Sequence, residues 1–446
     1  MKIIIAGAGE IGFHLSKQLS NEAHDITVID INQLPLDRID AAVEVLTING
    51  SSTSISVLKE AQIENTDLVL AVTSSEAINI NTAIIAKKLG AVRTVARVAN
   101  AEYVSADYTD MFKSLGIDHI VYPEELAAFE IVKLVQRSAA TDVLEFEDGK
   151  LSLLGLKLDQ KAPVVRKSMK VLSEEYSGFN FRIVAIQRGI RTIIPTGDDI
   201  LLPNDQIFVI SPKNKLDDII RLTGKSEVKI ENMMILGGGK IGRKAARLLE
   251  KSVNIKIIES NKDKTLNLAD YLENTLVIQG DGRDLDLLAQ ESIIDMDSFI
   301  ALTNDAETNI ISSLMAKHLG VEKTITQVDK ADYVPLTQTI GLDSLINKKL
   351  IAANNIMRFI RKADVISVAT LQGIDAEVFE FVAKPGSTVT KNPVKKLKFP
   401  KNAIIGGYIR DGEGTITVGD SQILPGDKVV IFALPGAVNK VEKFFH

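Results

Sequence analysis

Short runs of apolar residues alternate with amphipathic stretches along the first 122 residues. The runs are rich in Val and Ile and span residues 3–6, 26–30, 43–48, 68–72, 92–98 and 119–122, with a helical pattern beginning near Glu10. Strands that are apolar on both faces are typical of parallel sheets covered by helices on each side. Because crossovers between parallel strands are right-handed, the pattern predicts an α/β fold with a doubly wound Rossmann sheet.

This pattern occurs twice along the chain. Residues 7–12 read Gly-Ala-Gly-Glu-Ile-Gly, and residues 237–242 read Gly-Gly-Gly-Lys-Ile-Gly, an offset of 230 residues. Later landmarks keep the same offset, for example Asn79 and Asn309. A register held over so many residues indicates an internal repeat, and therefore two Rossmann lobes in one chain.

Each Rossmann pattern is followed by a helical segment and a turn-rich stretch. The helical segments span residues 123–137 and about 347–362, and short strands separated by turns follow at 143–211 and 365–433. Each half therefore ends in a small α+β lobe. The expected domains are 1–122 (first Rossmann lobe), 123–225 (connecting helix and first small lobe), 230–346 (second Rossmann lobe) and 347–446 (connecting helix and second small lobe).

Composition narrows the functional classes. The 446 residues are 45% hydrophobic and 25% charged, with a formal net charge of −6, which offers no broad attraction for nucleic acid. The chain has no Cys, and its five His lack the spacing that places two ligands on one helix face, so no metal centre is expected. No uncharged stretch reaches the ~20 apolar residues that span a bilayer. These features predict a cytoplasmic protein.

The two glycine loops are the strongest functional signal. Each follows a strand and opens a helix, and an acidic residue ends the next strand, Asp30 in the first half and Glu259 in the second. In a dinucleotide fold the glycines allow a tight turn, close approach of the pyrophosphate and close helix packing. Phosphate would meet free N–H groups at the helix N-terminus, and the carboxylate would accept ribose hydroxyls, which favours NAD(H) over NADP(H). A structural turn without a ligand is the alternative.

Polar residues after the fourth strand are further candidates. Thr73 and Ser74 lie where a Rossmann sheet opens its ligand crevice. Thr73 to Glu76 also fits a capping box, and Asn304 with Glu307 fits one in the second half. Ligand contact and helix capping are therefore equal alternatives, since a cap can also line a cleft.

The residue that ends the fifth strand differs between the halves. Arg97 would direct a guanidinium at the phosphates, with a surface ion pair as the alternative, whereas the second half has Gln327. Lys240 stands in the second loop where the first has Glu10, and its ammonium could partly replace the missing guanidinium. We expect the first cleft to bind its dinucleotide more tightly.

Binding without turnover is favoured over an enzyme. The sequence contains no Tyr-x-x-x-Lys motif and no Cys, and the segments after the Rossmann lobes are small for a substrate domain. The alternatives are an NAD-dependent oxidoreductase with an unrecognised substrate lobe and a scaffold with empty clefts.

Several motifs together are similar to those of a known family. They are the openings at residues 1–12 and 233–242, the segments Ala-Val-Thr-Ser-Ser-Glu and Ala-Leu-Thr-Asn-Asp-Ala-Glu-Thr-Asn, and the Gly-Asp tails at 197–198 and 419–420. They resemble the TrkA family, cytoplasmic regulatory subunits of bacterial Trk potassium uptake systems, over nearly the whole chain. The resemblance implies two RCK (KTN) domains and NAD(H), with ATP or ADP as further possible ligands. It also implies a homo-oligomeric ring, dimer or tetramer, peripheral on the inner face of the cell membrane, beneath an integral-membrane potassium-translocating subunit of the TrkH/TrkG type.

The family's nucleotide contacts carry over to both halves. They fall on Gly7, Ala8, Gly9, Glu10, Ile11, Gly12, Asp30, Thr73, Ser74 and Arg97, and on Gly237, Gly238, Gly239, Lys240, Ile241, Gly242, Glu259, Thr303 and Asn304. Many RCK domains have Gly-Asp after the third strand, which the second half keeps at 280–281, whereas the first half has Gly-Ser at 50–51. This departure, with Gln327, predicts unequal ligand preference.

Overall fold

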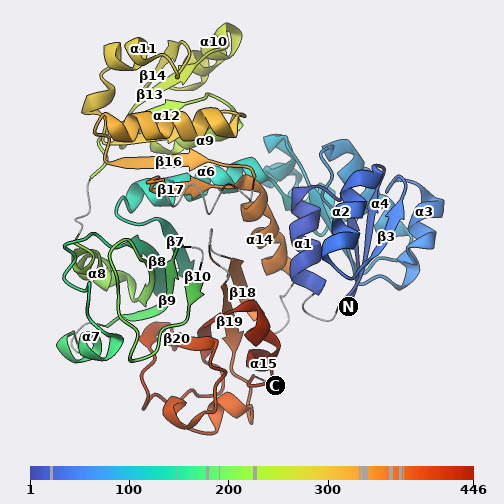
Figure 1. The fold of residues 1–446 in the computed structure, drawn as a ribbon. Helices are drawn as coiled ribbons and strands as arrows, with labels where there is room; N and C mark the ends of the chain where they lie inside the picture. The colour runs from blue at the N-terminus through green and yellow to red at the C-terminus, as the bar shows by residue number, and fades with distance from the viewer. Residues whose placement is uncertain are drawn as a thin grey trace. The chain divides into compact units, whose positions relative to one another are not determined.

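The chain forms two compact units, which we describe separately. The computed structural model describes residues 1–20, 24–147, 149–176, 180–189, 191–224, 229–330, 333, 340–360, 365–370, 374 and 376–445 (Figure 1). One unit contains residues 1–127 and 348–360, and the other contains residues 128–347 and 361–446. The expected domain end at residue 225 and the expected helix end at 361–362 lie outside the described residues.

The first unit is built around a six-stranded parallel sheet in the order β3-β2-β1-β4-β5-β6. Its strands are β1 (Lys2–Ala6), β2 (Asp25–Asp30), β3 (Leu46–Asn49), β4 (Leu68–Ala71), β5 (Arg93–Arg97) and β6 (His119–Val121). This order defines a Rossmann sheet and confirms the predicted fold. The apolar run 43–48 is not all strand, because the Val43 N–H closes the preceding helix on the Ile39 carbonyl and β3 begins only at Leu46.

Helices cover both faces of this sheet. One face carries α1 (Glu10–Ser20), α2 (Gln33–Ala42) and α14 (Lys348–Ile360), whose buried residues share a core with alternate residues of β1 and β2. The other face carries α3 (Ile55–Glu60), α4 (Glu76–Lys88) and α5 (Ala106–Ser114). Alternate residues of the central strands therefore pack against different helix layers, which explains their apolar character on both faces.

Helix α14 belongs to the second half in sequence and to the first unit in space. Its buried residues, which join the core beside α1, are Ala352, Ala353, Ile356, Met357 and Ile360. Arg93 places its Nη1 3.4 Å from the carbonyl oxygens of Phe359 and Ile360, where a cation complements the helix dipole. His119 stacks on Phe359 with ring centroids 4.7 Å apart and lies 3.0 Å from Asn355 Oδ1. The helix is thus fixed to the lobe by packing and by contacts at its last turn.

The second unit contains the second Rossmann lobe, with strand order β14-β13-β12-β15-β16-β17. Its strands are β12 (Asn232–Leu236), β13 (Asn254–Glu259), β14 (Thr275–Gln279), β15 (Ser298–Ala301), β16 (Lys323–Gln327) and β17 (Ser344–Ile346). Its helices include α9 (Lys240–Leu249), α10 (Lys262–Tyr271), α11 (Leu285–Gln290) and α12 (Ala306–His318). The strand order repeats that of the first lobe.

The connecting helix of the first half, α6 (Pro123–Gln136), is in the second unit from Ala128 onward. Lys244 on α9 lies over the Phe129 ring, with its Nζ 5.9 Å from the ring centroid. Each connecting helix therefore lies, at least in part, with the Rossmann lobe of the opposite half.

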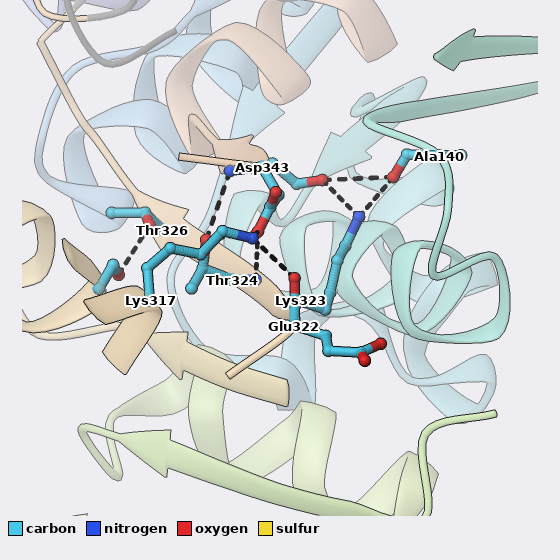
Figure 2. Close-up of polar contacts among 9 residues, drawn as sticks. Ala140, Lys317, Glu322, Lys323, Thr324, Thr326 and Asp343 are labelled. Atoms are coloured by element: carbon cyan, nitrogen blue, oxygen red, sulfur yellow. Dashed lines mark hydrogen bonds and ion pairs between the residues drawn. The ribbon is translucent and has the colours of Figure 1, made fainter. Parts of the chain in front are cut away.

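A buried lysine secures the chain just after α6 (Figure 2). Lys323, at the start of β16, is 4% exposed and donates from Nζ to the Ala140 carbonyl and to Ser344 Oγ at 2.9 Å. Nearby, Lys317 pairs with Asp343 at 2.6 Å. Burial favours a higher pKa for Asp343, but the charges of Lys317 and Lys323 outweigh burial and hold the pKa below its usual range. The network thus ties the segment that follows α6 to the second lobe.

The small lobes are antiparallel sheets in the orders β10-β9-β11-β8-β7 and β18-β19-β22-β20-β21. Their elements are β7 (Asp142–Phe146), β8 (Leu151–Lys157), α7 (Met169–Glu175), β9 (Arg182–Arg188), β10 (Arg191–Ile193), β11 (Gln206–Ser211) and α8 (Leu216–Leu222), then β18 (Val365–Thr370), β19 (Glu377–Val382), β20 (Ala403–Arg410), β21 (Glu413–Ile416), β22 (Lys428–Ala433) and α15 (Val438–Glu442). Phe208 and Phe432 are fully buried in one core shared by both sheets. Glu147 of the first small lobe and Lys428 of the second form an ion pair at 2.6 Å. In the described part of the chain, no helix has the length and apolar character needed to cross a bilayer.

We expect the docking of α14 to stabilise the first unit. Ile356→Ala removes a fully buried side chain and should cost about 2–5 kcal/mol, because a cavity remains. Amide hydrogen exchange in β1 and α1 measures this loss locally. Leu34→Ala is the control, since Leu34 is 81% exposed. Exchange in Ile356→Ala that matches wild type would contradict the docking of α14.

Candidate functional site

The first glycine loop is held by close backbone contacts. Gly7 has a φ of +113°, and a Cβ there would lie 2.8 Å from the Thr73 backbone nitrogen. A Cβ on Gly12 would lie 1.8 Å from the Gly7 carbonyl oxygen. A Cβ on Gly9 would meet no atom within 4 Å. Gly7 and Gly12 are therefore required by the fold of the loop, whereas Gly9 faces open space.

Asp30 lies at the carboxyl end of β2, beside the loop. Its Oδ2 accepts a hydrogen bond from the Ala8 N–H at 2.7 Å, and its Oδ1 accepts one from the Asn32 N–H at 2.9 Å. These two bonds hold the half-buried carboxylate at the edge of the loop. Each oxygen of an ionised carboxylate can accept a further hydrogen bond.

A buried asparagine organises the loop after β4. Asn79 is 1% exposed, and its Oδ1 accepts from both the N–H and the hydroxyl of Thr73, at 2.8 and 2.7 Å. Its Nδ2 donates to the Thr73 carbonyl at 3.0 Å and to the Arg97 carbonyl at 2.9 Å. Asn79 thus joins the ends of two neighbouring strands. The sequence signal was its match to Asn309, which makes the same bonds to Thr303.

The capping box expected at Thr73 to Glu76 is wrong. Ser75 caps α4, accepting from the Ile78 N–H at 3.4 Å, while the Thr73 hydroxyl bonds to Asn79. Glu76 instead accepts from the Ala99 and Asn100 N–H groups at 2.8 and 2.9 Å.

The expected cap at Asn304 and Glu307 is wrong as well. Asp305 caps α12 and accepts from the Thr308 N–H at 2.9 Å. Glu307 instead accepts from the Tyr333 hydroxyl at 2.8 Å.

Arg97 lies at the end of β5. One guanidinium nitrogen donates to the Thr73 carbonyl at 3.0 Å, while its Nε is buried without a hydrogen-bond partner. A buried, unpartnered N–H of a charged group is costly and rare. Such a group is available to a ligand that carries an acceptor.

These residues surround a cavity of about 380 Å³ in the first unit. Those predicted from sequence that line it are Gly7, Gly9, Glu10, Ile11, Asp30, Thr73, Ser74 and Arg97. Ala8 and Gly12 do not line it: the Ala8 N–H donates to Asp30, and Gly12 lies close to the Gly7 carbonyl. Sequence analysis missed the remaining lining residues, which are Ile29, Ile31, Asn32, Pro35, Gly50, Ser51, Ser52, Val72, Ser75, Ile78 and Lys349.

The second glycine loop repeats the backbone geometry of the first. Gly237 has a φ of +100°, and a Cβ on Gly242 would lie 2.2 Å from the Gly237 carbonyl oxygen. Glu259 is 8% exposed and accepts from the Gly238 N–H at 3.0 Å and the Asn261 N–H at 2.9 Å. The predicted loop residue Gly239 directly precedes α9, which begins with Lys240 and Ile241, as Gly9 precedes α1 with Glu10 and Ile11.

The side chains around the second loop differ from those around the first. A Cβ on Gly238 would lie 2.1 Å from Leu268 Cδ1, whereas the first half has Ala8 at this position. Gln327 is 3% exposed, and its Nε2 lies 3.4 Å from Asp329 Oδ1. The second site therefore has a neutral, buried amide where the first has a guanidinium on the cavity wall.

A Rossmann lobe followed by a small antiparallel lobe, repeated in one chain, is the architecture of paired RCK domains. The GsuK RCK domain shares it with a TM-score of 0.59 at 16% identity, over 100% of this chain and 94% of that chain. The GsuK channel bound to NAD has a TM-score of 0.59 at 17% identity, over 100% and 78% of the two chains. At these identities the likeness establishes the fold.

Sequence matches identify the family. Residues 3–123 and 233–348 match the TrkA-N domain, and residues 153–224 and 378–446 match the TrkA-C domain. Trk system potassium uptake protein TrkA of Vibrio alginolyticus is 33% identical over 452 residues, covering 100% of this chain and 98% of that protein. Its counterpart TrkA homolog 1 of Methanosarcina mazei is 32% identical over 454 residues and covers both chains fully. The chain belongs to the TrkA family, as its sequence motifs predicted.

The two glycines of the first loop should respond differently to substitution. Gly12→Ala should destabilise the ligand-free protein by about 3 kcal/mol or more, because its Cβ would collide with the Gly7 carbonyl. Gly9→Ala should change stability by less than about 0.5 kcal/mol, because its Cβ enters open space. Thermal unfolding without nucleotide tests both. Equal midpoints for the two variants would contradict this account of the loop.

Proposed function

We propose that this chain is a nucleotide-sensing regulatory subunit of a Trk-type potassium uptake system and binds NAD(H) in its first Rossmann cleft. The observation that carries the proposal is the cavity of about 380 Å³ that brings the glycine loop, Asp30 and Arg97 together. Ligand pockets typically have volumes of 300 to 1,000 Å³. The GsuK channel, a fold relative, has been solved bound to NAD and bound to ADP, so we include ADP and ATP as candidate ligands.

The phosphates would lie at the glycine loop. Gly9 leaves open space on the cavity wall, and α1 begins at Glu10 directly after it. The N-terminus of a helix presents free N–H groups and the positive end of the helix dipole. A pyrophosphate can therefore approach the backbone closely at Gly9, where any larger side chain would intrude.

Asp30 and Arg97 would fix the two ends of the bound nucleotide. The Asp30 carboxylate is held by two backbone N–H groups and can still accept from ribose hydroxyls. Arg97 would donate its unpartnered Nε–H to a phosphate oxygen, which forms a charge-assisted hydrogen bond. A 2′-phosphate beside Asp30 would be repelled, so NAD(H) is preferred over NADP(H).

The second cleft, at Gly237 to Gly242, Glu259, Thr303 and Asn304, would bind more weakly or prefer another nucleotide. Gln327 offers a neutral amide, and a charge-assisted hydrogen bond is roughly twice as strong as a neutral one.

Family membership supports the proposed regulatory role. Curated relatives are named Trk system potassium uptake protein TrkA, so the expected partner is an integral-membrane potassium-translocating subunit, contacted at its cytoplasmic face by an oligomeric ring of this chain. A nucleotide can change the open fraction of the pore only by binding one ring shape more tightly than another.

The partner can be tested directly. The tagged full-length chain should co-purify with a potassium-translocating protein from detergent-solubilised membranes. NADH should change the rate of potassium flux in vesicles that contain both proteins. Flux that is indifferent to both the chain and NADH would contradict the regulatory role.

Nucleotide binding should depend on Arg97 and Asp30. Isothermal titration of the full-length chain with NADH should show a loss of about 1.5–3 kcal/mol for Arg97→Gln and for Asp30→Ala, which is about 10- to 150-fold in affinity. Arg191→Gln removes the same charge from an exposed site on β10 and should leave the affinity unchanged. The absence of NADH, ADP and ATP binding to wild type would contradict the proposal, as would equal affinities of all variants.

A further inference from the structure

One wall residue of the first cavity comes from the other half of the sequence. Lys349 lies in the first turn of α14, which begins at Lys348, and it lines the cavity together with Gly9 and Arg97. The rest of the cavity wall comes from residues 7–97. The first cleft is therefore built from both halves of the chain.

The position of Lys349 is set by the docking of its helix. Ile356 and Ile360 are buried in the core beside α1, and Arg93 contacts the carbonyls of the last turn. Asn355 and Phe359 contact His119 at the start of β6. With its far end and one face fixed in this way, α14 presents its first turn to the cavity as part of a packed lobe.

The charges on the cavity wall favour an anion with more than one charge. Arg97 and Lys349 are cationic, and the two acidic side chains on the wall are already engaged. Glu10 is paired with Arg38, and Asp30 accepts from two backbone N–H groups. A ligand with two linked phosphates matches two cations that approach from different elements.

We propose that Lys349 is a direct contact for the phosphates of the nucleotide in the first cleft, so that this ligand is bound jointly by the two halves of the chain. The inference rests on the proposed nucleotide binding and adds a residue and a consequence to it. A nucleotide bound in the cleft stabilises the docked position of the first turn of α14 through this contact. Displacement of α14 removes the contact and lowers the affinity of the cleft for the nucleotide. Ligand binding and the docking of the second half's connecting helix are then linked.

The lysine at position 349 is not repeated in the first half of the sequence. Strand β6 begins at His119 and β17 at Ser344, and these residues pair with Val95 and Ile325, which are related by the repeat. Counting forward from these strands, Lys349 corresponds to Glu124 in α6. The first half thus carries a carboxylate at the position where the second half carries the ammonium.

The test compares two neighbouring lysines in the full-length chain. Lys349→Gln should weaken the affinity for ADP and NADH about 5- to 20-fold, measured by isothermal titration, because it removes one charge-assisted contact. Lys348→Gln removes the same charge from the same helix turn, but Lys348 does not line the cavity, so its affinity should stay within about twofold of wild type. Lys349→Arg should retain most of the affinity, which shows that a weaker Lys349→Gln variant has lost a cation and not its fold.

A second measurement follows the helix itself. In wild type, ADP should slow amide hydrogen exchange both in the glycine loop at 7–12 and in α14. In Lys349→Gln at saturating ADP, the slowing should persist in the loop and disappear from α14. Slowing of α14 in this variant as in wild type would overturn the proposal, as would equal affinities of Lys349→Gln and Lys348→Gln. If Arg97→Gln still weakens nucleotide binding in that case, only the proposed role of Lys349 is wrong. If the wild-type chain binds no nucleotide, the proposed nucleotide binding and the role of Lys349 are both wrong.

Discussion

The burial of α14, the connecting helix of the second half, on the first Rossmann lobe is the constraint on which the architecture depends. Helix α14 carries five fully or nearly fully buried apolar residues, and a 13-residue helix with so large an apolar face is not stable in water unless a partner covers that face. The cover comes from α1 and the sheet of the first lobe. The two halves cannot separate without exposing this surface, so the duplicated sequence forms one interdependent structure.

A cationic residue at equivalent positions of the two lobes contacts the connecting helix of the opposite half or the segment after it, but the cation and its burial differ. Arg93 and Lys323 both begin the fifth strand of their lobes, and each donates to carbonyls at or beyond the end of the opposite half's connecting helix. Arg93 is half-buried, and its contacts are 3.4 to 3.5 Å long. Lys323 is 4% exposed and also donates to Ser344 at 2.9 Å. A buried ammonium with good partners is costly to unpair, so the contact after α6 resists opening more than the contact at the end of α14.

The fold and much of the first cleft could be predicted from the sequence because they depend on local requirements. Gly7 and Gly12 could be recognised because only glycine permits the backbone approaches of the loop, and Asp30 because it ends a strand beside them. Lys349 could not, because it lies some 250 residues from Arg97 in sequence and only the tertiary docking of α14 brings it to the cavity. The cap at Ser75 was missed for a local reason, since the Thr73 hydroxyl bonds to Asn79 and the helix is capped two residues later. Local motifs thus identified the site, but not the groups that reach it from elsewhere.

Because both domains lie in one chain, the two clefts can also differ in sequence. In a symmetric dimer of single-domain chains, a substitution at one cleft appears at both. Here the first cleft has Arg97 and Lys349 on its wall, whereas the residue of the second half that corresponds to Arg97 is the neutral Gln327. If the proposed phosphate contacts form, a ligand that binds through charge should favour the first cleft, where Lys349 links it to α14. Because a ligand shifts an equilibrium only by its difference in affinity between two states, the proposed regulation requires the first cleft to bind its nucleotide more tightly in one arrangement of α14 than in another.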